Sequence, residues 1–202
     1  MGLLSTAVTF TRYKLLAPIP DDFWNWAHEK VVERSFQDRE GLDEYVAGWT
    51  PFDRPFQSNI HLTDMSFAGF LVLGMRVDVR RVPSTVLKKY CALEEERLKQ
   101  EKGLNRLSKK MLTEIRNNMR LQLLSRAIPV PSLTDFMWDI ESGDVFLFAR
   151  QDRLRMVFED LFKATFDMLL TPVAPYSLAV SLLKADALKL KALEEVASDA
   201  WI

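Results

Sequence analysis

Residues 67–79 read FAGFLVLGMRVDV, an apolar run rich in β-forming side chains. A run of this length and composition predicts a strand in the centre of a sheet. Shorter β-rich and helical segments precede it. They are a strand over residues 5–15, a helix over about 21–34 that begins at Asp21-Asp22, a short strand or turn over 45–51 and a loop over 52–64.

After the central strand, the pattern changes to two long helices. The first covers about residues 84–102 and is broken by Gly103, and the second covers about 108–127 with Ser108 as its N-cap. Shorter elements follow. They are strands over 135–141 and 145–149 joined by the turn Ser142-Gly143-Asp144, a helix from Asp152 to about 166, a strand over 169–173 and a helix over about 177–198.

This order of elements predicts an α+β fold. We expect two pseudo-related strand/helix half-units around one mixed sheet, with the two long helices projecting from it as a helical hairpin. The corresponding domains are residues 1–82 for the first half of the central domain, 83–130 for the hairpin lobe, 131–176 for the second half and 177–202 for a C-terminal helix.

The composition is typical of a folded, soluble protein, with 48% hydrophobic and 27% charged residues. No apolar run approaches the roughly 18 to 20 residues that cross a bilayer, so we expect no membrane partner. Cys91 is the only cysteine, which excludes an intramolecular disulfide and favours a reducing, cytoplasmic setting.

Positive charge is concentrated in one segment of the chain. The formal net charge is -1, whereas residues 84–126 contain 11 Lys/Arg against 5 Asp/Glu, and the remainder contains 16 against 23. A near-neutral total is unusual for a nucleic-acid-binding protein, whose footprint is normally basic. The local excess therefore points to the two long helices as the region that meets a polyanion.

The second long helix has two different faces when its residues are placed at about 100° intervals. One arc of about 120° is apolar and should pack inward. It consists of Met111, Leu112, Ile115, Met119 and Leu123. Another arc of about that width is cationic. It consists of Arg106, Lys109, Lys110, Arg116 and Arg120.

A row of cations without base-reading Asn/Gln or stacking aromatic residues suits the spaced phosphates of a duplex, whatever its sequence. The alternative interpretation is an ordinary solvated helix face. The candidate DNA-binding residues are Lys88, Lys89, Arg97, Lys99, Lys102, Arg106, Lys109, Lys110, Arg116, Arg120 and Arg126.

The usual signatures of covalent chemistry are missing from the sequence. His28 and His61 have no metal-ligand spacing, and the chain contains neither a phosphate-binding glycine loop nor a nucleophile elbow. The acidic groups at Asp21-Asp22, Glu94–Glu96 and Glu159-Asp160 are better explained as a helix start and helix surfaces. We therefore expect no catalytic residue, no metal ligand, no cofactor and no enzymatic activity.

Five short motifs follow one another along residues 5 to about 175. They are Thr11-Arg12-Tyr13, Gly48-Trp49-Thr50-Pro51, Val82-Pro83-Ser84-Thr85-Val86-Leu87-Lys88-Lys89, Leu123-Leu124-Ser125-Arg126-Ala127-Ile128-Pro129 and Met137-Trp138-Asp139-Ile140-Glu141-Ser142-Gly143. No single motif is specific, but together, in this order, they resemble the RdgC family of recombination-associated proteins.

That resemblance implies a nucleoid-associated cytoplasmic protein that forms a ring-shaped dimer around double-stranded DNA. Such proteins coat DNA without reading its sequence and thereby limit access of the RecA recombinase. Family members usually carry Phe at the position of Ile128, where it supports contact between subunits, so Ile128 is the candidate oligomer contact. The chain resembles a short variant without the family's usual C-terminal third.

Two other functions stay open at the level of the sequence. A protein-interaction module without DNA binding agrees with the near-neutral total charge. A metal-dependent nuclease is less favoured, because it needs acidic residues that converge from separate elements.

Overall fold

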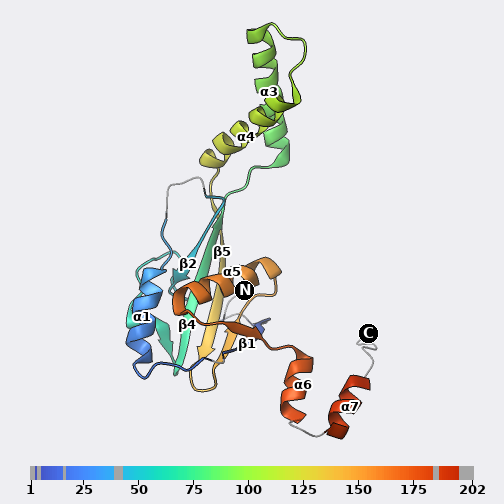
Figure 1. Ribbon diagram of the computed structural model, residues 1–202. Coiled ribbons are helices and arrows are strands. Elements are labelled where there is room, and N and C mark those ends of the chain that lie inside the picture. Colours follow the sequence, from blue (N-terminus) through green and yellow to red (C-terminus); the bar gives the residue numbers. More distant parts are fainter. Residues whose placement is uncertain (1–2, 4–5, 16, 39–42, 184–186, 196–202) are drawn as a thin grey trace.

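The computed structural model describes residues 3, 6–15, 17–38, 43–183 and 187–195, which form a sheet, covering helices and a projecting helical hairpin (Figure 1). The strands are β1 (Thr11–Leu15), β2 (Tyr45–Thr50), β3 (Ser66–Phe67), β4 (Phe70–Val79), β5 (Val130–Asp139), β6 (Asp144–Leu147) and β7 (Leu170–Pro172). The helices are α1 (Phe23–Glu33), α2 (Leu62–Met65), α3 (Ser84–Lys102), α4 (Lys109–Arg126), α5 (Asp152–Phe166), α6 (Pro175–Leu183) and α7 (Ala187–Glu195). The predicted α+β class is confirmed.

All seven strands belong to one sheet, in the order β2-β4-β5-β6-β1-β7, with β3 paired to one end of β4. Every ladder among the described residues is antiparallel, whereas we expected a mixed sheet. The one parallel contact in this part of the chain is an isolated bridge between Ser35 and Trp49. Because β1 lies between β6 and β7, the strands of the two sequence halves interleave.

Strands β4 and β5 form the centre of the sheet and lead directly into the hairpin. Their register runs from the pair Phe70–Asp139 to the pair Val79–Val130, and α3 and α4 continue beyond that last pair. The expected start of β5 at residue 135 was wrong, because the strand begins at Val130 and includes Pro131.

A proline inside a strand is tolerated where its missing N–H would face an open edge. Strand β6 pairs only with residues 136–139 of β5, so the first half of β5 has no partner on that side among the residues that the structure describes. Pro131 and Asp135 are four positions apart in the strand, so their backbone N and C=O groups point to the same side. The Asp135 carbonyl accepts from the Phe148 N–H on the β6 side. The missing donor of Pro131 therefore removes no ladder hydrogen bond.

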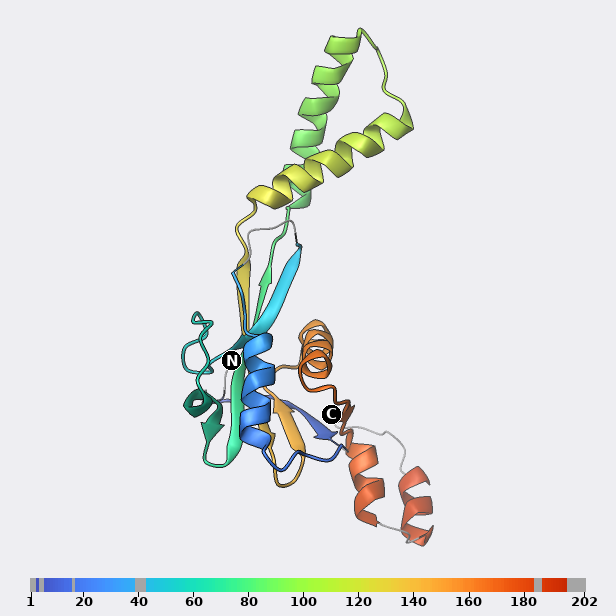
Figure 2. The same ribbon diagram turned by 60° about the vertical axis from the view of Figure 1, so that its left-hand side comes forward.

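The hydrophobic core lies between one face of the sheet and helices α1 and α5 (Figure 2). Aromatic rings dominate it, with Trp49 and Phe136 at 4.9 Å and Phe162 and Phe166 at 4.8 Å between ring centroids. The Trp49 indole N–H donates to Thr165 Oγ1 at 2.8 Å, so its polar atom is satisfied inside the core. Helix α5 contributes the buried side chains of Phe158, Phe162 and Phe166 to this core.

Tyr13 is buried beneath α5 and keeps a polar contact there. Its hydroxyl donates to a Glu159 carboxylate oxygen at 2.9 Å. Burial, reinforced by the Glu159 carboxylate, raises the pKa of Tyr13 to about 12. The tyrosine is therefore neutral throughout the physiological range.

Gly48 allows β2 to pass very close to the segment that follows α1. A Cβ atom at this position would lie 2.5 Å from Phe36 Cα and 2.7 Å from Phe36 N. The approach is fixed by two backbone hydrogen bonds, from Phe36 N–H to Trp49 O at 2.8 Å and from Trp49 N–H to Arg34 O at 3.0 Å. Only glycine fits this position without displacing backbone.

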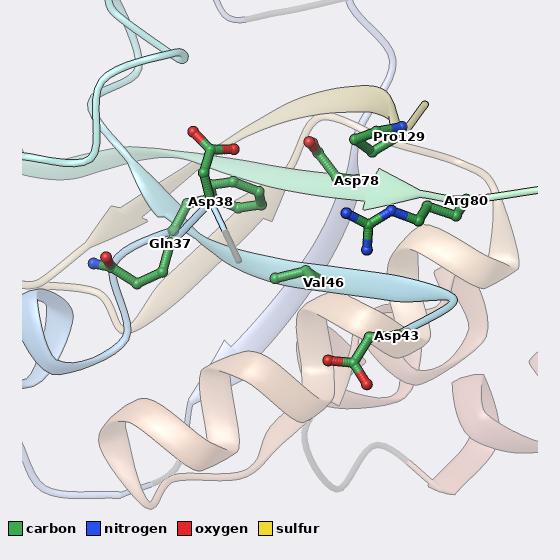
Figure 3. A pocket seen from close by; sticks show the side chains of 8 residues that line it. Gln37, Asp38, Asp43, Val46, Asp78, Arg80 and Pro129 are labelled. Atoms are coloured by element: carbon green, nitrogen blue, oxygen red, sulfur yellow. The ribbon is translucent and has the colours of Figure 1, made fainter. Parts of the chain in front are cut away.

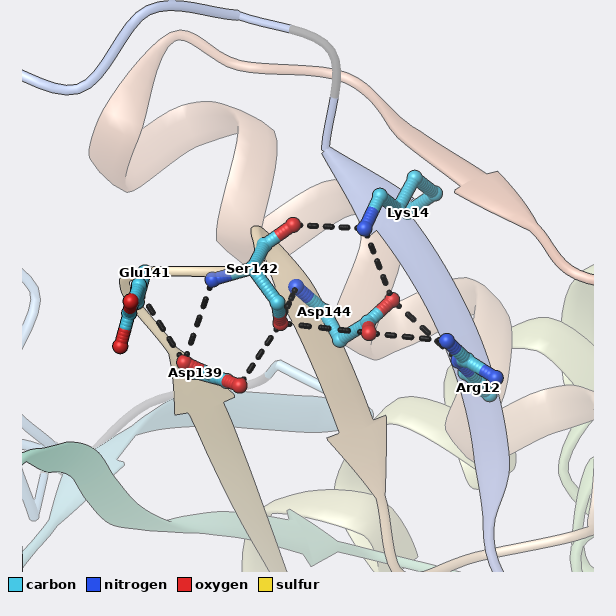
Figure 4. A network of polar contacts seen from close by, with 6 residues as sticks. All are labelled: Arg12, Lys14, Asp139, Glu141, Ser142 and Asp144. Atoms are coloured by element: carbon cyan, nitrogen blue, oxygen red, sulfur yellow. Dashed lines mark hydrogen bonds and ion pairs between the residues drawn. The ribbon is translucent and has the colours of Figure 1, made fainter.

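The predicted hairpin turn between β5 and β6 is confirmed, and Figure 4 shows its polar contacts. Gly143 in this turn has a φ of 72°. Asp139 accepts from the Ser142 hydroxyl at 2.7 Å, and this bond holds the pKa of Asp139 below its usual value. Asp144 accepts from Arg12 Nη2 at 2.8 Å and from Lys14 Nζ at 3.3 Å. Burial acts to raise the pKa of Asp144, but these two cations outweigh it and lower the pKa.

Several other expected boundaries differ from the structure. The strand expected over 5–15 is restricted to β1 within the described residues, outside which residue 5 lies, and the loop expected over 52–64 contains the start of α2. Asp22 stands at the N-cap of α1 but makes no side-chain capping bond. The C-terminal helix expected over 177–198 is two helices, α6 and α7; its residues 184–186 and 196–198 lie outside the described part. No helix in that described part is long and apolar enough to cross a bilayer.

Candidate nucleic-acid interface

Helices α3 and α4 project from the sheet as the expected hairpin (Figures 1 and 2). Helix α3 ends at Gly103, which adopts the left-handed conformation with a φ of 61°. Ser108 caps α4, because its side chain accepts from the Met111 N–H at 3.3 Å. Both of these predicted helix boundaries are confirmed.

The hairpin is held together by a thin layer of apolar side chains. Ile115 and Leu124 are the buried residues of α4, and Leu107 is buried in the preceding loop. Helix α3 has no buried residue. The apolar face predicted for α4 is confirmed, since its other four members are half-buried. They are Met111, Leu112, Met119 and Leu123.

The cationic side chains of this segment lie at the surface. Ten of the eleven candidates are exposed, and Lys99 is half-buried. Two of the eleven form ion pairs, Arg97 with Glu94 and Glu101, and Arg120 with Glu44. The other nine make no ion pair with any described residue. They are Lys88, Lys89, Lys99, Lys102, Arg106, Lys109, Lys110, Arg116 and Arg126.

Arg97 is the most fully neutralised of these cations. Its Nη2 and Nε lie 2.7 and 2.9 Å from the two carboxylate oxygens of Glu94, and its Nη1 lies 3.0 Å from Glu101. The Glu94 hydrogen bonds raise the pKa of Arg97, and Arg97 in turn lowers the pKa of Glu94. This guanidinium is therefore the least available of the set to a phosphate.

The cations do not form one continuous row. At about 100° per residue, Lys109, Arg116 and Arg120 share an arc of about 40° on α4, with Lys110 about 80° beyond it. Arg106, which we expected on the same helical face, lies in the loop before α4.

On α3, Lys88, Lys99 and Lys102 share an arc of about 60°, whereas Lys89 and Arg97 point in other directions. Lys88 of α3 and Arg116 of α4 line one cavity of about 350 Å³ between the helices, together with Glu95. The fold thus brings a subset of the predicted cations together across the helix pair.

Three aspartates, Asp38, Asp43 and Asp78, line a cavity of about 270 Å³ at the base of the hairpin (Figure 3). Asp78 is buried, and its two oxygens accept from Arg76 Nε and Nη2 at 2.7 Å each. Arg76 also reaches Asp38 at 3.2 Å and lies 4.0 Å from the ring centroid of Phe36.

This buried Arg76–Asp78 pair was not predicted from the sequence. The signal was present, because two charged residues two positions apart in an apolar strand lie on the same face of the sheet. Among the described residues, no group of three or more His, Cys, Asp or Glu side chains is arranged to hold a metal ion.

The fold and the charge distribution define an α+β protein whose antiparallel sheet carries a projecting hairpin with exposed cations. The model of the family described as "Putative exonuclease, RdgC" matches residues 12–183. Since this match spans most of the 202-residue chain, the protein belongs to the RdgC family, as the sequence motifs predicted. A comparison with curated proteins gives no match.

Proposed function

We propose that this protein binds duplex DNA without sequence preference through the cations of the α3–α4 hairpin. The observation that carries the proposal is the group of nine candidate cations that have no ion-pair partner among the described residues. Membership of the RdgC family supports a DNA-associated role.

The chemistry of the hairpin suits phosphate contact. Exposed lysines and arginines release condensed counterions when they neutralise phosphates, and this contribution is insensitive to base sequence. The total charge of -1 is compatible with such binding, because the positive field needs to exist only on the surface that meets the duplex.

The finer elements of the proposal follow the family resemblance. The protein acts in the cytoplasm on nucleoid DNA as a homodimer, and its coating of DNA limits recombinase access during homologous recombination. Ile128, between α4 and β5, is 85% exposed and is the proposed subunit contact. Its exposed side chain is available to a second copy.

Fluorescence anisotropy with two unrelated duplexes of equal length tests the proposal. We expect equal affinities within about threefold and a steep loss of affinity as salt rises, with each neutralised phosphate contributing about 0.9 to the logarithmic slope. Affinity that does not change with salt would refute phosphate-based binding.

A matched pair of variants tests the hairpin itself. The double variant Lys109→Gln/Arg116→Gln should reduce the salt slope by about two and weaken binding to both duplexes alike. Arg97→Gln serves as control, since Glu94 and Glu101 already neutralise this arginine. Equal losses from the control and the double variant would argue against a defined phosphate-contacting surface.

We propose further that the protein is not an enzyme. The family description mentions an exonuclease, so the direct test is incubation of end-labelled linear duplex with Mg²⁺ or Mn²⁺. We expect the DNA to stay intact. Shortened products that persist after purification to constant specific activity would overturn this part of the proposal.

An exposed apolar surface favours a protein-interaction module as the second candidate. Leu121, Ile128 and Val130 are all exposed where the hairpin meets the sheet. A protein complex that survives nuclease treatment, in the absence of any DNA shift, would favour this function over the first.

A further inference from the structure

A cavity of about 320 Å³ lies at the N-terminal end of α5, beside the half of β5 that pairs with β4 but not with β6. Polar and apolar residues from the N-terminal segment, β5 and the start of α5 line it. They are Thr9, Ser132, Leu133, Thr134, Phe148, Ala149, Arg150, Gln151 and Leu154.

The end of α5 presents backbone donors at this cavity. The first intrahelical bond runs from Arg155 N–H to Gln151 O at 3.0 Å, so the preceding N–H groups have no acceptor within the helix. Gln151 occupies the N-cap but makes no side-chain capping bond. Because α5 has 15 residues and its first N–H groups have no side-chain cap, the partial positive charge at this end favours an anion there.

Thr134 provides an independent indication of a ligand. It is only 3% exposed, it lines the cavity, and its hydroxyl has no hydrogen-bond partner among the described residues. An unpartnered hydroxyl at a cavity wall can donate to a group that is bound there. Arg150 also lines the cavity, is exposed and forms no ion pair within the described part of the chain.

The charge of the lining distinguishes this cavity from the others. It contains one arginine and no carboxylate. The three cavities at the hairpin and its base each contain at least one aspartate or glutamate. Asp152, the acid in the first turn of α5, is not part of the lining and is held by Arg155 at 3.1 Å.

We propose that this cavity binds a phosphate group of the DNA backbone, as a contact separate from the hairpin. The inference rests on the proposed function and extends it. The phosphate oxygens accept from the free N–H groups of α5, from the Thr134 hydroxyl and from the Arg150 guanidinium. Strand β5 follows α4 after a short connection. A duplex bound to the hairpin would therefore meet this second phosphate contact near the start of β5, at the base of the hairpin.

DNA-binding measurements on two variants test the proposal in the full chain. Arg150→Gln should weaken duplex binding about three- to tenfold and reduce the salt slope by about one. Thr134→Val removes the hydroxyl at nearly constant volume and should weaken binding about two- to fivefold. Arg34→Gln is the matched control, because Arg34 is exposed and lies outside this cavity; its effect should stay within twofold.

Inorganic phosphate separates a DNA phosphate from a free phosphate compound. At constant ionic strength, phosphate should compete with duplex for the wild-type protein more effectively than for the Arg150→Gln variant. Phosphate binding detected by NMR at the amides of residues 152–154, together with unchanged DNA affinity in the Arg150→Gln variant, would assign the cavity to a free compound and overturn the proposal.

The remaining outcomes separate this inference from the proposed function. Loss of binding in the hairpin double variant, with no loss in either cavity variant, would overturn the phosphate site and leave the hairpin function intact. Absence of any duplex binding by the wild type would overturn both. Because Arg150 is exposed, we expect its variant to keep the stability of the wild type, and thermal melts of the Arg150→Gln and Thr134→Val variants check both sites.

Discussion

Gly48→Ala should destabilise the protein by about 3 kcal/mol, and the loss can be derived from the contacts of this glycine. An added Cβ would lie 2.5 Å from Phe36 Cα, whereas ordinary carbon contacts are about 3.5 to 4.0 Å, so backbone must move by about 1 Å. Overpacking of this kind costs about 1–3 kcal/mol. The shift also weakens the two backbone hydrogen bonds around Trp49, each with a net contribution of about 1 kcal/mol.

Urea unfolding followed by tryptophan fluorescence measures this change, since Trp49 is completely buried beside the substituted residue. For a chain of this size the expected loss corresponds to a fall in Tm of about 6–12 °C. Gly69→Ala is the control, because Gly69 has a φ of 86° but no atom within 4 Å of its added Cβ. This control should cost only about 1 kcal/mol of backbone strain. Equal costs for the two variants would refute the close-approach explanation.

Three further predictions concern titration and a helix end. Because the pKa of Tyr13 is raised from 10.0 to about 12, the stability that it contributes should be complete below pH 10 and should disappear toward pH 12. An ultraviolet titration should show one tyrosine that ionises at higher pH than the others, and Tyr13→Phe should abolish that step. Asp144→Asn should cost about 1–2 kcal/mol at neutral pH, since Arg12 and Lys14 lower the pKa of Asp144. This contribution is present above the ordinary aspartate range and is lost as pH falls through the lowered pKa, so an equal cost at pH 2 and pH 7 in urea titrations would contradict it. Gly103→Ala should cost about 1 kcal/mol through backbone strain alone, because the φ of 61° is unfavourable and the space around it is open; a circular dichroism melt with an unchanged midpoint would argue otherwise.

The local signals in the sequence predicted the hairpin well. Gly103 and Ser108 act through their own backbone geometry and hydrogen bonding, so their effect does not depend on the rest of the fold. The face that contains Ile115 was predictable for a similar reason, because the helical repeat alone determines which residues lie together.

Features that depend on distant partners were not predictable from local patterns. Pro131 is tolerated inside β5 because β6 is too short to reach it, and this can be recognised only when the whole sheet is known. The pairing of Arg120 with Glu44 likewise joins α4 to a residue far away in sequence. Which cationic side chains share a helical face also depends on where α4 begins. Because α4 begins at Lys109, Arg106 lies in the loop before it.

The thin apolar layer of the hairpin has a consequence for local unfolding. Amide protons of α3 should exchange with solvent through openings that leave β4 intact, since α3 buries no side chain whereas β4 is buried along nearly its whole length. The region with the concentrated positive charge is thus a region whose conformation can change at little cost in free energy. A surface of this kind can adjust its curvature to a bent or irregular polymer without loosening the sheet that carries it.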